Sequence, residues 1–185
     1  LVTSSYRSSF LDGRGVAAST ARAGNVIGGG DFAAGRIIPD CVRAVRTGNP
    51  IQIRNPFSVR PYQHVLEPLS AYLLIAHRQY DDAKVAGSYN VGPDSRDCIT
   101  TGELADLFCR SWGGDARWEH VGDEGPHEDQ VLRLDCSKIQ RDLGWTPRWH
   151  TDCAVEETVA WTKAWLEGAD VLTVMKRQMD IFLKS

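Results

Sequence analysis

The sequence predicts an α/β protein, because short segments rich in β-branched residues alternate with segments whose apolar residues recur at helical spacing. Residues 16–27 are of the first kind, and residues 36–47 are of the second. The chain has 185 residues, of which 42% are hydrophobic and 24% charged, a composition typical of globular proteins. This length is enough for one sizeable domain, or for one domain and part of another.

Apolar spacing and the glycines that follow it locate the expected helices. One helix begins with a capping box, in which Thr100 caps the first turn and Glu103 reaches back to the cap. Another begins near Pro68, a residue tolerated in a first turn. Helices are expected over residues 2–12, 36–47, 68–77, 101–112, 137–143, 152–167 and 171–183.

Runs of β-branched and aromatic residues that end at turn residues locate the expected strands. The longest run, residues 16–27, has no helix cap and predicts a buried strand, followed by a turn at Gly28–Asp31. A second turn is expected at Asn55-Pro56, between two short strands. Strands are expected over residues 16–27, 51–53, 62–65, 89–91, 117–121 and 131–134.

Several tryptophans are expected in the core rather than in a binding site. Two of them lie four residues apart on an expected helix, which is a burial pattern and not a stacking platform. The tryptophans expected in the core are Trp112, Trp145, Trp149, Trp161 and Trp165.

The charge and the cysteines exclude several classes of function. The net charge is −3, so the chain has no general attraction for nucleic acid or for an anionic membrane, and an anionic ligand would need a local basic site. No apolar stretch is long enough to span a bilayer. Five cysteines are an odd number, and they form no CxxC pair, so we expect reduced thiols in a cytoplasmic protein and no metal site.

Two motifs match known chemistry only superficially. Gly28-x-Gly30-x-x-Ala33 fits a loose dinucleotide fingerprint, but no helix is expected to start at once and no acidic residue follows about twenty positions later. Tyr80 and Lys84 have the YxxxK spacing of short-chain dehydrogenases. The carboxylates beside Tyr80 would raise its pKa, the wrong direction for proton transfer, so a solvated helix end is the better interpretation.

A series of segments nevertheless resembles one enzyme family over nearly the whole chain. The longest is Ala21-Arg-Ala-Gly-Asn-Val-Ile-Gly-Gly-Gly-Asp31, and shorter segments follow in the order and at the spacing of that family. Among these are Val59-Arg-Pro-Tyr-Gln-His-Val-Leu-Glu-Pro68, Tyr89-Asn-Val-Gly-Pro93 and Leu143-Gly-Trp-Thr-Pro147. Together they resemble the nucleotide-sugar-modifying enzymes of the extended short-chain dehydrogenase/reductase type, also called NAD-dependent epimerases/dehydratases. Pro61 and the Pro126-His-Glu128 segment are similar to the CDP-glucose 4,6-dehydratase pattern within that family.

The resemblance implies a fold and a division of the chain. The expected fold is α/β, consisting of the last strands and helices of a Rossmann-type parallel sheet and a smaller C-terminal α/β domain that binds substrate. Residues 1–27 and 67–93 would be the remnant of the NAD-binding domain. Residues 28–66 and 94–185 would form the nucleotide-sugar-binding domain. The intact enzyme would be a cytoplasmic NAD-dependent lyase that dehydrates CDP-glucose in deoxysugar and lipopolysaccharide biosynthesis.

The resemblance also implies roles for individual residues. Arg60 would clamp the substrate diphosphate, as suits a forked cationic donor, although a surface ion pair is the alternative. Arg22 and Asn25 would contact the cofactor, and His127 would bond a phosphate or ribose oxygen or be merely solvated. The residues expected to bind substrate are Asn25, Arg36, Ile37, Gln52, Arg54, Arg60 and His127. Gln52 fits an ordinary amphipathic strand nearly as well.

Catalytic residues are expected upstream of Leu1, so this chain alone would be inactive and would expose strand surfaces through which it self-associates. The intact protein would be a homodimer. Two alternatives stay open: an epimerase, dehydratase or decarboxylase acting on another nucleotide sugar, and a non-catalytic nucleotide-sugar-binding protein.

Overall fold

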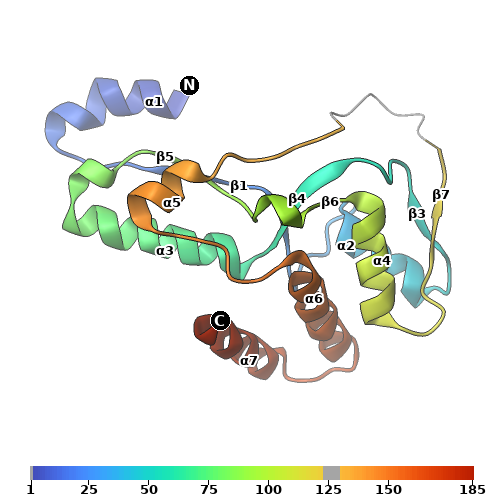
Figure 1. The fold of residues 1–185 in the computed structure, drawn as a ribbon. Coiled ribbons are helices and arrows are strands. Elements are labelled where there is room, and N and C mark those ends of the chain that lie inside the picture. Colours follow the sequence, from blue (N-terminus) through green and yellow to red (C-terminus); the bar gives the residue numbers. More distant parts are fainter. Residues whose placement is uncertain (1, 123–129) are drawn as a thin grey trace.

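A computed structural model of the protein describes residues 2–122 and 130–185. Within these residues the strands form three small sheets with helices packed against them, so the predicted α/β fold is confirmed (Figure 1). In the same part of the chain, every helix is too short or too polar to form a membrane span.

The sheets are small, and most of their pairings are parallel. β1 (Thr20–Ala23) pairs with β5 (Ser88–Val91) in parallel. β4 (Val59–His64) is the centre of a second sheet, parallel to β2 (Asn25–Ile27) and antiparallel to β6 (Cys98–Thr100). β3 (Ile51–Ile53) and β7 (Trp118–His120) form the third, a parallel pair.

The single strand predicted over residues 16–27 is wrong in its continuity. The structure begins the strand at Thr20 and divides it at Gly24, where the chain leaves β5 and joins β4. A Cβ atom at Gly24 would lie 2.8 Å from the carbonyl oxygen of Pro61, so only glycine fits between the two sheets. Because of this division, β2 lies beside the strand that carries Arg60.

The predicted helices are confirmed, with small shifts of their ends. The first is distorted: α1 continues through a π-helical turn (Arg7–Leu11) and a 3-10 turn (Asp12–Arg14) before Gly15 ends it with φ +68°. The capping box of Thr100 and Glu103 is present. The α-helices are α1 (Val2–Tyr6), α2 (Ile37–Arg46), α3 (Leu66–Asp81), α4 (Thr101–Trp112), α5 (Ser137–Leu143), α6 (Thr151–Leu166) and α7 (Val171–Lys184).

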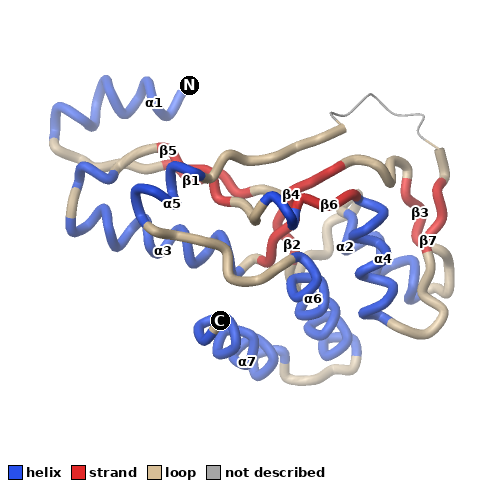
Figure 2. Tube along the Cα trace, viewed as in Figure 1, coloured by secondary structure: helices blue, strands red, loops and turns tan. Residues whose placement is uncertain are grey.

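Two other predictions are wrong. Residues 131–134 form no strand; Val131 makes only an isolated bridge to Val59, and the chain leading to α5 is drawn as loop in Figure 2. Val131 is 55% exposed, so its apolar side chain does not hold the segment in a sheet. Trp165 is 39% exposed rather than in the core, because its ring packs against Phe32, which is itself 56% exposed, as well as against Trp161.

The buried side chains form two clusters. One is packed between the sheets of β3 and β4 and the helices α2, α4 and α6, and includes Ile53, Leu104 and Phe108. The other lies between β5 and the helices α3 and α5, and includes Tyr89 and Trp145. Gln63 joins the two regions, because its side-chain amide on β4 donates to the carbonyl oxygen of Val91 on β5 (2.9 Å).

Candidate functional site

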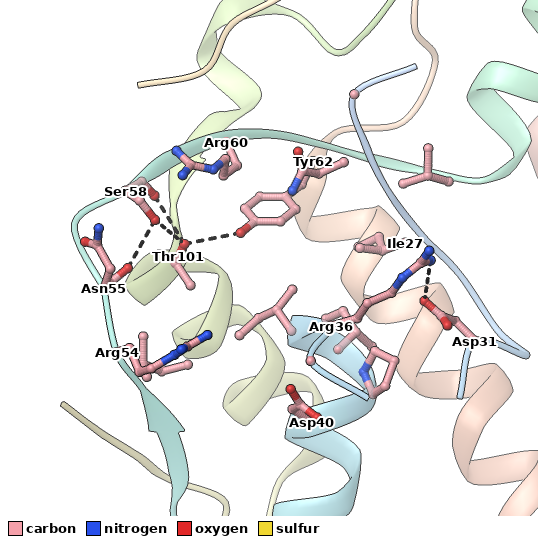
Figure 3. A pocket seen from close by; sticks show the side chains of 18 of the residues that line it. Ile27, Asp31, Arg36, Asp40, Arg54, Asn55, Ser58, Arg60, Tyr62 and Thr101 are labelled. Carbon is pink, nitrogen blue, oxygen red and sulfur yellow. Dashed lines mark hydrogen bonds and ion pairs between the residues drawn. The ribbon is translucent and has the colours of Figure 1, made fainter. Parts of the chain in front are cut away.

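A cavity of about 730 Å³ lies over the first cluster, where the ends of several elements meet (Figure 3). Its walls are β2, the loop of residues 28–36, the first turn of α2, the segment from β3 to β4, and the first residue of α4. The floor is apolar and includes Ile27, Ile38 and Ile53, all of which are buried. These elements also pack on the first buried cluster, and this packing holds the walls of the cavity in place.

Three arginines from separate elements line this cavity. Arg54 follows β3, Arg60 lies in β4, and Arg36 caps the start of α2. The Arg36 guanidinium donates to Asp31 (3.1 Å), and that of Arg60 donates to the carbonyl oxygen of Val59 (3.0 Å). Figure 3 shows the three side chains arranged around one space. Guanidinium groups so arranged suit an anion with several oxygens.

The start of α2 adds to the positive character of the site. Ile37 and Ile38 are its first two residues, and both line the cavity. The first backbone N–H groups of a helix have no partner within the helix, and the helix dipole makes this end positive. Asp40 lines the same wall, but its carboxylate accepts a hydrogen bond from Arg43 one turn later. The wall formed by α2 therefore favours an anionic group on the side where the helix begins.

A cluster of hydroxyl groups lies on the opposite wall. The Thr101 hydroxyl lies 2.9 Å from that of Ser58 and 3.3 Å from that of Tyr62, and all three residues line the cavity. The sequence alone did not predict these residues. Their signal was the spacing of two residues between Ser58, Arg60 and Tyr62, of which Arg60 and Tyr62 lie in β4. The contribution of Thr101 comes from a segment about forty residues away and needed the tertiary structure.

Most residues predicted to bind substrate are brought together by the fold. Asn25 lies opposite Tyr62 in the register between β2 and β4. Arg22 lies apart from the cavity lining, on β1, where its Nε donates to Asn90 (3.0 Å). His127 lies outside the described residues. The predicted residues that line the cavity are Asn25, Arg36, Ile37, Gln52, Arg54 and Arg60. Their roles, and that of Arg22, stay predictions.

The glycine turn at residues 28–30 does not fit a dinucleotide cradle. α2 begins only at Ile37, and a Cβ atom at Gly29 would lie 2.1 Å from the ring of Trp161. The space beside this glycine is therefore filled by protein, not kept open for a pyrophosphate. The YxxxK pair is no better placed, since Tyr80 is 90% exposed at the end of α3 and Lys84 lies beyond that helix. Neither motif therefore has the geometry of the cofactor chemistry that its spacing suggests.

The thiols of Cys41 and Cys153 show no sign of activation. Burial is the largest effect on the pKa of Cys41, which is raised, and on that of Cys153, which is raised to about 11.

In residues 2–122 and 130–185 no cluster of His, Cys, Asp and Glu side chains is arranged to hold a metal ion. The chemistry that these residues offer is binding of an anion by arginines, backbone N–H groups and hydroxyls.

Comparison with known proteins gives one strong relative. No protein-family model matches the chain. The CDP-glucose 4,6-dehydratase of Salmonella typhimurium is 43% identical over 191 aligned residues, which cover 100% of this chain and 53% of the relative. The chain thus spans about half the length of the curated relative that it matches.

Solved structures with the same fold include enzymes that act on other nucleotide sugars. The dTDP-glucose 4,6-dehydratase of Bacillus anthracis in complex with NAD has a TM-score of 0.72 at 20% identity, covering 88% of this chain and 48% of that one. A UDP-glucose 4-epimerase of Stenotrophomonas maltophila has a TM-score of 0.74 at 20% identity, covering 91% and 54%. At this identity the likeness shows the fold alone. The chain is therefore related over its whole length to CDP-glucose 4,6-dehydratase, and it has the fold of the NAD-dependent epimerases and dehydratases of the extended short-chain dehydrogenase/reductase type.

Proposed function

We propose that this chain is the C-terminal, substrate-binding part of an NAD-dependent nucleotide-sugar 4,6-dehydratase, and that its substrate is CDP-glucose. The observation that carries the proposal is the cavity lined by Arg36, Arg54 and Arg60. A nucleoside diphosphate sugar has two phosphates, which need several forked donors, and an apolar floor accommodates the faces of its rings. The relative at 43% identity supports the choice of CDP-glucose.

In this proposal the residues of the chain bind and orient the substrate. Arg60 would contact the diphosphate from β4, with Asn25 donating to the same region from the neighbouring strand. Arg54 and Gln52 would contact the nucleoside from the end of β3, together with the first residues of α2. A sugar held in this way would project from the cavity toward groups that perform the chemistry.

The remaining parts of the proposed enzyme are assigned to protein outside this sequence. The cofactor NAD would be bound mainly there, with Arg22 and Asn25 of this chain in contact with it. The catalytic groups that convert CDP-D-glucose to CDP-4-dehydro-6-deoxy-D-glucose would also lie there. We further propose a homodimeric, cytoplasmic enzyme of deoxysugar biosynthesis.

Nucleotide binding by calorimetry tests this proposal. The protein should bind CDP more tightly than UDP, dTDP or GDP. Arg60→Ala should weaken CDP binding roughly 10- to 100-fold, since a shielded bond to a charged group contributes about 1.5–3 kcal/mol. Arg60→Lys should recover only part of this loss, because lysine lacks the fork.

Arg46→Ala is the matched control, because Arg46 is exposed in the last turn of α2 and does not line the cavity. It should leave CDP binding unchanged. Preferential binding of UDP, dTDP or GDP would overturn the choice of CDP-glucose. Failure of all four nucleotides to bind would overturn the proposed function itself.

A further inference from the structure

We infer that the hydroxyl of Thr101 is a positioning group that sets the direction of Arg60 and the turn after Arg54, an inference that rests on the proposed function. Thr101 is the first residue of α4, and its hydroxyl points into the cavity wall toward β4 (Figure 3). Its partners come from the strand and turn that carry the two arginines.

The contacts of Thr101 bracket Arg60 along the strand. Its Oγ1 lies 2.9 Å from the Ser58 hydroxyl and 3.3 Å from the Tyr62 hydroxyl. Ser58 directly precedes β4 and Tyr62 lies within it, two positions on either side of Arg60, and all three residues line the cavity. Ser58 and Tyr62 are 5% and 3% exposed, which leaves their hydroxyls little freedom. One hydroxyl therefore fixes the strand on both sides of the arginine.

The same cluster extends to the turn after β3. The Ser58 hydroxyl donates to the carbonyl oxygen of Asn55 (3.1 Å), the residue that follows Arg54. The Thr101 hydroxyl can then donate to the Ser58 hydroxyl (2.9 Å), while the Tyr62 hydroxyl donates to Thr101 (3.3 Å). Each hydroxyl has one proton, and this arrangement uses each proton once. The cluster thus connects Tyr62 to Asn55 across the wall.

The fold has other bonds that hold the same elements together. The backbone N–H of Thr101 donates to the carbonyl oxygen of Ser58 (2.9 Å), and that of Gly102 donates to Pro56 (2.8 Å). The α4 cap depends on Thr100 and Glu103, not on Thr101. These bonds do not involve the Thr101 hydroxyl. Its removal should therefore affect the orientation of the Arg60 side chain more than the stability of the fold.

Two substitutions at one position separate the hydroxyl from the shape of the side chain. Thr101→Val removes the hydroxyl and keeps the volume, whereas Thr101→Ser keeps the hydroxyl. In calorimetry, Thr101→Val should weaken CDP binding about tenfold, the effect of losing one well-placed charged contact, and Thr101→Ser should stay within about twofold of the unchanged protein. In an Arg60→Ala background, Thr101→Val should have a much smaller effect, because the group that it positions is gone.

Hydrogen exchange of residues 54–60 in the unliganded protein gives an independent readout. Exchange should be faster in Thr101→Val and unchanged in Thr101→Ser. The inference is overturned if the two variants bind CDP equally well, or if the effect of Thr101→Val persists in full without Arg60. If the unchanged protein binds none of the nucleoside diphosphates, both the proposed function and this inference fail. If it binds CDP but the Thr101 variants bind equally well, only this inference fails.

Discussion

The molecule has two regions that differ in how completely they are buried. The cavity region consists of β2, β3, β4, β6 and β7 with α2, α4 and α6, and its core includes side chains with no exposure, such as those of Leu104 and Phe108. The β1–β5 region consists of those two strands with α1, α3 and α5. Its core is smaller, and no residue of α1 is buried.

Exposed apolar side chains occur in both regions, including Phe57 (76%) before β4, but those of the β1–β5 region gather on the first helix and α3. In the β1–β5 region Phe10 is 52% exposed, and Leu73 on α3 is 73% exposed. Large apolar surfaces of this kind are normally covered by other protein. The cavity region has its own core beneath the binding wall, so the geometry of the arginines does not depend on the exposed helices. Binding and self-association should therefore be separable properties of the two regions.

A pair of truncations tests this contrast and should give the largest effect. Leu104→Ala, in the core of the cavity region, should lower the free energy of unfolding by roughly 2–5 kcal/mol, because it leaves a cavity in a fully buried cluster. Phe10→Ala should cost less than about 1 kcal/mol, since its ring packs mainly on Tyr6 and is half exposed. Urea denaturation measures both. Equal losses would mean that the two regions are equally well packed.

The second prediction concerns Glu67, which joins the two regions. Glu67 lies in the first turn of α3, has no exposed surface, and accepts hydrogen bonds from the backbone N–H groups of Arg148 (2.9 Å) and Trp149 (2.7 Å), just before α6. Glu67→Ala should lower the free energy of unfolding by roughly 2–4 kcal/mol, because a buried and a partly buried backbone donor lose their acceptor.

Glu67→Gln is the matched control, since its amide oxygen can still accept from both N–H groups. Glu67→Gln should lower the free energy of unfolding by about 1 kcal/mol or less. The substitution also removes a buried carboxyl, whose pKa is raised by that burial. Denaturation followed separately by tryptophan fluorescence and by circular dichroism should remain one transition in Glu67→Gln. If Glu67→Ala proves as stable as Glu67→Gln, the contact does not hold the regions together.

How far the sequence predicted these features depends on the range of the interactions involved. Local signals gave the helices and the capping box at Thr100, because cap and spacing lie within one helix. The role of Gly24 was missed, since the clash that requires glycine there comes from Pro61 on another strand.

The candidate site was predicted only in part for the same reason. Arg36, Arg54 and Arg60 could be proposed from their own segments, and the fold brings all three to one cavity. Thr101 could not, because its partners are about forty residues earlier and their approach depends on how α4 packs against β4. Side chains that act through other side chains need tertiary contacts, which no spacing in the sequence encodes.

The third prediction places a pH-dependent stability in the cavity region. His64, in β4, is 2% exposed and packs against Trp149, with ring centroids 4.9 Å apart. The backbone N–H of Leu66 donates to its Nδ1 (3.3 Å), which favours the neutral ring. Burial lowers its pKa from 6.5 to about 4. Because the pKa is lower in the folded state, the stabilisation is complete above about pH 6.5 and is lost as the pH falls through about 4.

Between about pH 7.5 and pH 4.5 this residue should reduce the free energy of unfolding by roughly 2–3 kcal/mol, the range that linkage gives for such a shift. His64→Asn removes the titrating group and keeps an acceptor near the position of Nδ1. Over this pH range the free energy of unfolding of the variant should therefore fall by that much less than the free energy of unfolding of the unchanged protein. Glu67 acts in the opposite direction, because its raised pKa favours the folded state at low pH, and it is present in both proteins.

His77→Asn, at an exposed position beside Asp81, should leave the pH dependence of the unchanged protein nearly intact. Urea denaturation at several pH values measures the difference, and equal pH dependence in His64→Asn and the unchanged protein would show that His64 does not titrate as a buried group.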